Sequence, residues 1–222
     1  MKVSLIVLVK NEIEAMQVIL PKIKREWYDE LIIVDGNSTD GSFEYAQKQG
    51  YQAFKQKENG FTAAFLEGVK KATGDIIILF SPDGNSVPEK IPELVNKMKE
   101  GYDIVTVSRY LEGAKSYDDD AVTAFGNRLF TGLINLLFGA KLTDALVMYR
   151  AYKKSVINEL KGGKVKSMIE TRIILRAIRK KLKLGEIPGD EPSRIGGVRK
   201  LRPLVDGFKL LMMILREFFV IS

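Results

Sequence analysis

Gly74–Asn85, with the sequence GDIIILFSPDGN, decides the fold of this 222-residue chain. Its apolar run from Ile76 to Phe80 predicts a strand buried on both faces, the kind found in parallel sheets. Polar and turn-forming residues follow at once, and Asp83 lies among them. Open α/β sheets bind ligands at the carboxyl ends of their strands, where a carboxylate suits a divalent cation that holds a phosphate. The stretch therefore predicts an α/β fold with a functional site around Asp83.

Apolar and turn-forming stretches alternate on both sides of this segment. Strands are predicted at residues 2–9, 30–34, 51–56, 75–80 and 102–108. Helices are predicted at 12–27, with a bend at Pro21, after the Asp35 loop as far as residue 49, at 59–73 and at 88–99. Strand and helix in succession predict a mostly parallel sheet with helices on both faces. Beyond Ser108 the succession breaks, and we expect helices at 121–138, 166–181 and 205–220 and strands at 145–152 and 182–187.

The composition, 45% apolar and 28% charged, is typical of a globular domain. Since no run of 18 apolar residues occurs and the opening MKVSLIVLVKNE fits a first strand, we expect neither a transmembrane helix nor a signal peptide. The chain has no cysteine and no histidine, which excludes disulfides, thiolate or imidazole metal ligands and a histidine base. Any metal must bind oxygen ligands, which favours Mg²⁺ or Mn²⁺.

Charge is unevenly spread along the chain. Residues 1–149 hold 17 Lys+Arg and 21 Asp+Glu, a net −4, whereas residues 150–222 hold 18 and 7, a net +11. A basic region on an acidic body suggests an anionic partner, such as nucleic acid, anionic lipid or phosphate groups. Nucleic acid is disfavoured because the basic residues are not interleaved with aromatic ones, which base stacking requires.

Two loops carry the chemistry. Asp35 opens the first, DGNSTDGS, where its carboxylate can accept bonds from ribose hydroxyls or a base N–H. Taken alone, this loop fits a simple turn better, with Asp40 or Ser38 capping the next helix. In the second loop Asp83 and Asn85 can bind a cation, and a tight turn explains them equally well. Because both loops end strands of one sheet, we expect them to face the same crevice.

The chain resembles the family 2 glycosyltransferases with the GT-A (Rossmann-like) fold and is most similar to the dolichol- and polyprenol-phosphate sugar transferases. The blocks that carry the resemblance include IIVDGNSTDGS, NGFTAAFLEGVKKATGDIIILFSPDGN, GYDIVTVSRY, GNRLFTGLINLLFG and SRIGGVRKLRPLVDGFKLL. The resemblance implies a GT-A domain over residues 1–203, with a nucleotide-sugar half at about 1–110 and an acceptor half at about 111–203. It implies inverting, metal-dependent transfer of a sugar from a nucleotide-sugar donor to a polyprenyl phosphate.

The resemblance also implies roles for single residues. The residues implied to bind the donor are Leu8, Lys10, Glu12, Asp35, Gly60, Ser81 and Asp83, and those implied to bind Mg²⁺ or Mn²⁺ are Asp83 and Asn85. The residues implied to bind the acceptor phosphate are Arg109, Arg128, Arg194 and Lys200, and the catalytic residues are Asp83 and Asp144. A phosphate acceptor needs no general base, whereas a hydroxyl acceptor would need one, for which Asp144 is the candidate. A structural ion pair or a helix cap explains Asp144 equally well.

Several residues depart from the family pattern. Ser81 replaces the first carboxylate of the family's D-x-D, so we expect a weaker metal site. Lys10 stands where many relatives have tyrosine, Thr62 replaces a glycine, and the segment LVMYR at 146–150 has lost the small residues of S-G-F-R. These departures keep two alternatives open: transfer to a saccharide or lipid hydroxyl, and a catalytically silent nucleotide-sugar binder.

The C-terminal helix at 204–222 is strongly apolar but too short to span a bilayer. We expect it at a membrane interface or in an oligomer contact, with packing on the domain as the alternative. The basic residues between 150 and 202 suit an anionic membrane surface. The predicted location is therefore cytoplasmic, peripheral on the inner face of the membrane.

Overall fold

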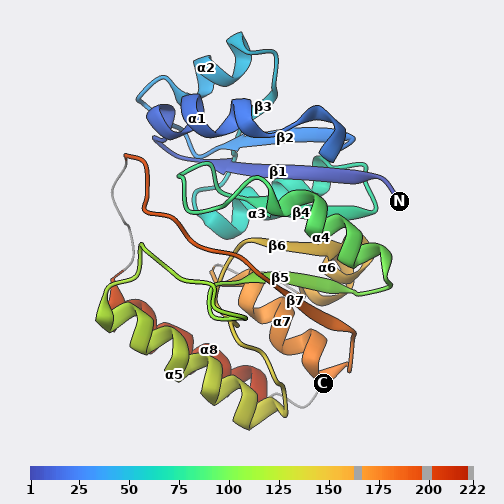
Figure 1. Cartoon of the computed structure of the whole chain (residues 1–222), viewed down its shortest axis with the longest axis vertical. Helices are drawn as coiled ribbons and strands as arrows, with labels where there is room; N and C mark the ends of the chain where they lie inside the picture. The colour runs from blue at the N-terminus through green and yellow to red at the C-terminus, as the bar shows by residue number, and fades with distance from the viewer. Residues whose placement is uncertain (163–166, 197–201, 220–222) are drawn as a thin grey trace.

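The computed structural model describes residues 1–162, 167–196 and 202–219 (Figure 1). Its centre is a seven-stranded sheet in the order β3-β2-β1-β4-β6-β5-β7. The strands are β1 (Val3–Val9), β2 (Glu30–Asp35), β3 (Gln52–Lys55), β4 (Ile76–Phe80), β5 (Ile104–Ser108), β6 (Arg150–Lys153) and β7 (Leu184–Pro188). Every pairing is parallel except those of β6, which runs antiparallel to β4 and β5. The predicted α/β fold with a mostly parallel sheet is confirmed.

Helices cover both faces of the sheet. They are α1 (Ile13–Ile19), α2 (Ser42–Lys48), α3 (Phe61–Lys71), α4 (Lys90–Lys99), α5 (Ala121–Phe138), α6 (Lys154–Leu160), α7 (Ile169–Arg179) and α8 (Pro203–Phe219). One buried cluster joins the sheet to α1, α2 and α4, and a second joins it to α3, α6 and α7. All five residues of β4 are buried because the strand lies at the centre of the sheet and is covered on both faces.

Two local predictions were wrong, and one helix was not predicted. The helix at 12–27 ends at Ile19, and two 3₁₀ turns follow it, the first with Pro21 near its start. The strand at 145–152 begins only at Arg150, because Asp144 accepts the backbone N–H of Leu146 and of Val147 and turns the chain there. The helix α6, which follows β6 directly, was not predicted.

The C-terminal helix α8 packs along α5 and α7, and Figure 1 shows α5 and α8 side by side at one end of the sheet. Leu210, Met213 and Ile214 of α8 are buried against α5 and α7. Glu217 accepts hydrogen bonds from Arg176 at 2.8 and 3.2 Å and pairs with Arg172 at 3.1 Å. The side of α8 that faces away from α5 and α7 is exposed. Packing of this helix on the domain therefore leaves an apolar face turned toward the solvent.

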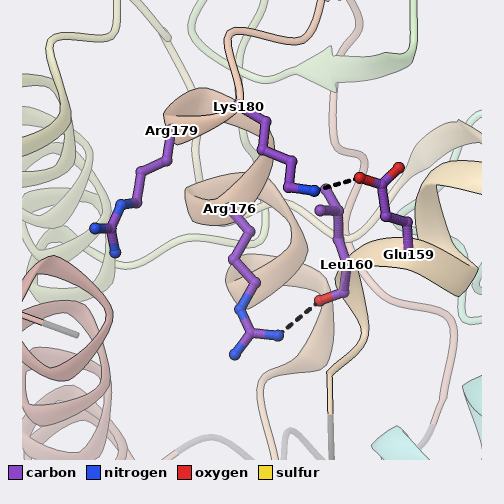
Figure 2. Close-up of a pocket in the computed structure, with 5 residues that line it drawn as sticks. All are labelled: Glu159, Leu160, Arg176, Arg179 and Lys180. Carbon is purple, nitrogen blue, oxygen red and sulfur yellow. Dashed lines mark hydrogen bonds and ion pairs between the residues drawn. The ribbon is translucent and has the colours of Figure 1, made fainter. Parts of the chain in front are cut away.

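Arg176 also joins α7 to α6 by donating to the carbonyl of Leu160 at 2.8 Å (Figure 2). These two residues line a small cavity of about 200 Å³ together with Glu159, Arg179 and Lys180. Lys180 pairs with Glu159, and Arg179 donates to the backbone carbonyl of Glu217. The charged groups around this cavity therefore hold the last three helices together.

Candidate active site

A single cavity of about 1160 Å³ begins at the carboxyl ends of β1, β2 and β4 and extends between α5 and α8. Nine of the residues singled out from the sequence line it: Leu8, Lys10, Glu12, Gly60, Ser81, Asp83, Asn85, Arg109 and Arg194. Asp35, Arg128 and Asp144 are not part of this lining, and Lys200 lies outside the described residues. Gly36, next to Asp35, lines the cavity together with Asp83, so the two acidic loops do face one crevice.

The loops after β1 and β2 are tied together by hydrogen bonds. Asp40 accepts the backbone N–H of Ile13 at 3.1 Å and of Ser42 at 3.0 Å, which is the turn role open to it from the sequence. Asp35 is fully buried, and its Oδ1 accepts the N–H of Ser38 at 2.9 Å. Its Oδ2 is buried without a hydrogen-bond partner among the residues the structure describes. Because a buried acceptor without a partner is costly, this oxygen suits a ligand hydroxyl or N–H.

The turn after β4 holds Asp83 in a fixed position. Asp83 Oδ1 accepts the N–H of Asn85 at 3.1 Å, and the carbonyl of Asp83 accepts the N–H of Ile195 at 2.8 Å. Gly84 has a φ of +95°, and a Cβ there would lie 2.8 Å from the Ile195 side chain. Glycine is therefore required both by the left-handed backbone and by the close approach of the segment around Ile195.

The same turn offers oxygen ligands to a cation. Asp83 supplies a carboxylate, and the Oδ1 of Asn85 is buried without a hydrogen-bond partner among the described residues. Those residues contain no group of three or more acidic side chains placed to hold a metal ion. A hard cation such as Mg²⁺ is commonly bound by one or two protein oxygens, with phosphates and waters completing its shell. The turn fits a cation that arrives with a phosphate ligand.

Arg109 and Asp144 form a buried ion pair beside the cavity. Arg109 donates from Nε to Asp144 Oδ2 at 2.6 Å and from Nη2 to Oδ1 at 3.1 Å. Its Nη1 lies 3.2 Å from Glu191 and 3.6 Å from Asp119. Burial lowers the pKa of Arg109, but the bonds and charges of Asp144 and Glu191 outweigh burial and raise it above the ordinary value. The geometry favours the ion-pair interpretation of Asp144, because its oxygens are committed to Arg109 and to backbone N–H groups.

Arg128 shares an aromatic partner with Arg109. The two guanidinium carbons lie 5.5 and 5.3 Å from the ring centre of Tyr110. The Tyr110 hydroxyl donates to Asp119 at 2.6 Å; burial and this bond raise its pKa to about 12. Two of the arginines assigned to the acceptor phosphate thus lie at the ring of one tyrosine.

Glu170 is a cavity residue that the sequence analysis missed. It lies in the first turn of α7, is 8% exposed, and its Oε2 has no hydrogen-bond partner within the described ranges. Burial raises its pKa above the ordinary 4.5, although the charge of Arg150 acts in the opposite direction. The sequence does carry one signal that singles out this carboxyl: Glu170 is the only acidic residue between Glu159 and Glu186. An isolated buried carboxyl on a cavity wall can bind a ligand hydroxyl.

Comparison with known proteins agrees with this geometry. A family model described as Glycosyl transferase family 2 matches residues 4–161. The chain is 27% identical over 212 residues to a dolichol-phosphate mannosyltransferase of Pyrococcus furiosus, covering 91% of this chain and 60% of that protein. It is 25% identical over 199 residues to a dolichyl-phosphate hexose transferase of Haloferax volcanii, covering 89% of this chain and 85% of that protein. The chain thus spans less than two thirds of the first of these relatives.

Among solved structures, glucosyl-3-phosphoglycerate synthase of Mycobacterium tuberculosis, in complex with Mn²⁺, UDP and its product, has a TM-score of 0.76 to this chain. The two are 18% identical, and the match covers all of this chain and 81% of the synthase. At this identity the match establishes the fold alone, and the expected GT-A-like architecture is confirmed. Since the matched family segment covers most of the chain and includes both the Asp35 and the Asp83 loops, the chain belongs to glycosyl transferase family 2.

Proposed function

We propose that this glycosyltransferase moves a sugar from a nucleotide-sugar donor to a polyprenyl phosphate, with inversion at the anomeric carbon. One observation carries the proposal: a single cavity joins the acidic strand ends to an apolar channel between α5 and α8. A donor with a charged diphosphate and an acceptor with a charged head and an apolar chain need these two environments side by side.

The donor binds at the strand ends. The buried oxygen of Asp35 accepts a hydroxyl of the ribose or an N–H of the base, with Glu12 and Gly60 nearby on the cavity wall. Asp83 and Asn85 would hold Mg²⁺ or Mn²⁺ beside the diphosphate, where the cation would stabilise charge that develops on the leaving group. The Mn²⁺ and UDP in the complex of the mycobacterial synthase support this assignment.

The acceptor binds in the channel. Its apolar wall includes Val122, Phe125, Phe130, Leu204, Phe208 and Leu211. Arg109 and Arg194 on the cavity wall, with Arg128 at the ring of Tyr110, hold the phosphate near the donor. The names of the two archaeal relatives, which are transferases of dolichol-phosphate or dolichyl-phosphate, support a lipid phosphate.

The reaction is a displacement at the anomeric carbon. An oxygen of the acceptor phosphate attacks this carbon and forms the new C–O bond, while the C–O bond to the diphosphate breaks and the nucleoside diphosphate leaves. The attacking oxygen is already anionic, so no side chain needs to remove a proton. Transfer to a hydroxyl would need a base, and Asp144 could act only after release from Arg109, which favours the phosphate acceptor.

We also propose that the protein works on the cytoplasmic surface of a membrane. α5 and α8 expose large apolar side chains: Val122, Phe125, Leu129 and Leu136 on α5, and Leu204, Phe208, Met212 and Phe219 on α8. Of the described helices, α5 alone has the length and apolar composition to cross a bilayer, and 17% of it is buried in the protein. We place α5 and α8 in the interface rather than across it, because α8 packs along α5 and each also packs on α7.

Turnover of nucleotide sugars by the whole chain tests the proposal. Each of several sugar nucleotides is offered with a polyprenyl phosphate, with the matching polyprenol and with a free saccharide. We expect product only with the phosphate, and its loss in Asp83→Ala at unchanged thermal stability. Lys99→Ala, an exposed change on α4, is the matched control and keeps full activity. Unchanged turnover in Asp83→Ala, or product only with a hydroxyl, would contradict the proposal.

A further inference from the structure

Arg194 lies beside the turn after β4 and binds the carboxylate proposed to hold the cation. Its Nη2 lies 2.8 Å from Asp83 Oδ2, and its Nη1 lies 3.4 Å from Oε1 of Glu12. The Asp83 side chain is 9% exposed and that of Arg194 is 23% exposed, so water screens their attraction only in part. The neighbouring hydrogen bond from Ile195 to the Asp83 carbonyl fixes the segment there.

A cation and this guanidinium compete for the same oxygen. Of the residues from Ser81 to Ser86, Asp83 alone carries a charge. A magnesium-type cation binds a carboxylate oxygen at about 2.1 Å, which would place it against a guanidinium that now lies 2.8 Å from Oδ2. Two like charges so close repel strongly in a partly buried site. The cation can therefore occupy Asp83 fully only when Arg194 leaves it.

Two buried atoms beside this ion pair have opposite character. Arg194 Nε is a buried donor and Asn85 Oδ1 a buried acceptor, and neither has a hydrogen-bond partner among the residues that the structure describes. A phosphate oxygen would satisfy the donor, and a cation would satisfy the acceptor. A diphosphate with its cation satisfies both and gives the guanidinium new anionic oxygens in exchange for Asp83.

We propose that Arg194 is the counter-ion of Asp83 in the donor-free protein and that it couples cation binding to diphosphate binding. Without a donor, the guanidinium keeps the cation from Asp83. A bound diphosphate draws Arg194 away, and the cation then binds. The inference rests on the proposed donor site, and it makes Arg194 a positioning residue at the donor end, in addition to the acceptor role assigned above. Linkage requires that the cation and the diphosphate raise each other's affinity by the same factor.

The decisive measurement is Mn²⁺ affinity without nucleotide, by calorimetry or by electron paramagnetic resonance of free Mn²⁺. We expect Arg194→Ala to bind Mn²⁺ about tenfold more tightly than the unmodified chain, within the range of ordinary coupling energies. Lys57→Ala removes one positive charge from an exposed position close to Gly60 in the chain and is the matched control, for which we expect little change. Unchanged or weaker binding in Arg194→Ala would overturn the proposal, as would an equal gain in Lys57→Ala, which would indicate a general charge effect.

A second measurement tests the coupling. The affinities for UDP and for GDP are measured with and without Mn²⁺, and the factor by which Mn²⁺ raises them is compared between the unmodified chain and Arg194→Ala. We expect this factor to fall severalfold in the variant, and an unchanged factor would overturn the coupling. Binding of neither nucleotide, with no turnover of any sugar nucleotide, would count against the proposed function, while the Mn²⁺ measurement would still decide the competition between Arg194 and the cation.

Discussion

Replacing Asp144 by asparagine tests whether this carboxylate is structural or catalytic. Asp144→Asn keeps the size of the side chain and removes its charge. In the native protein the carboxylate is 0% exposed and accepts two hydrogen bonds from the Arg109 guanidinium. The substitution therefore leaves a buried guanidinium without its main counter-ion.

The expected cost follows from the partners that Arg109 retains. Removing one member of a buried ion pair typically costs roughly 3–5 kcal/mol. Because Glu191 at 3.2 Å and Asp119 at 3.6 Å still face the guanidinium, we expect a loss of stability at the lower end of this range, about 3 kcal/mol. In a protein of this size each kcal/mol shifts the melting temperature by about 2–4 °C, which predicts a fall of roughly 6–12 °C.

Thermal and urea unfolding followed by circular dichroism measure this fall. The double variant Arg109→Met/Asp144→Leu removes both charges, and we expect it to lose less stability than the two single changes together. A melting temperature within about 1 °C of the unmodified chain would refute the structural role, since 1 kcal/mol alone should shift it further. If such a stable Asp144→Asn chain bound donor but had lost turnover, Asp144 would be the base for a hydroxyl acceptor.

Three further predictions concern the rest of the site. The raised pKa of Glu170 means that the folded state holds its proton above pH 4.5, where the unfolded state has lost it, so the contribution of this group to the unfolding free energy falls as pH rises through this window. Burial raises the pKa of Glu191 as well, so urea titrations should show a smaller fall in Glu170→Gln than in the unmodified chain. Gly84→Ala should cost about 1–3 kcal/mol, because of its left-handed backbone and the nearby Ile195, and an unaltered melting temperature would contradict this. The double variant Phe125→Ser/Phe208→Ser should keep its stability within about 1 kcal/mol yet lose flotation with anionic vesicles, whereas unchanged flotation would exclude the apolar face of α5 and α8 as the membrane contact.

The central strand and its turn could be predicted because their signals are local. The run Ile76–Phe80 is apolar at every position, and the turn residues after it allow few other conformations. The same holds for the β2 strand and the Asp35 loop. These segments place the cavity at the strand ends, which is why nine of the predicted site residues line it.

What could not be predicted depends on contacts between residues far apart in the chain. Arg194 and Asp83 are separated by more than a hundred positions, and an ion pair leaves no periodic pattern in either segment. The turn at Asp144 replaced a predicted strand for the same reason: its residues are apolar enough for a strand, but a buried carboxylate held by Arg109 accepts their backbone N–H groups. Tertiary hydrogen bonds override local propensity in such places.

The serine at position 81 and the arginine on Asp83 form one electrostatic arrangement. A turn with two carboxylates would repel itself without a cation and would hold a divalent ion strongly in the empty enzyme. With Ser81, the turn carries one negative charge, which a single guanidinium can balance. A turn with a single carboxylate is therefore electrically balanced before the donor arrives. Its affinity for a cation rises when a diphosphate brings further negative charge and engages Arg194.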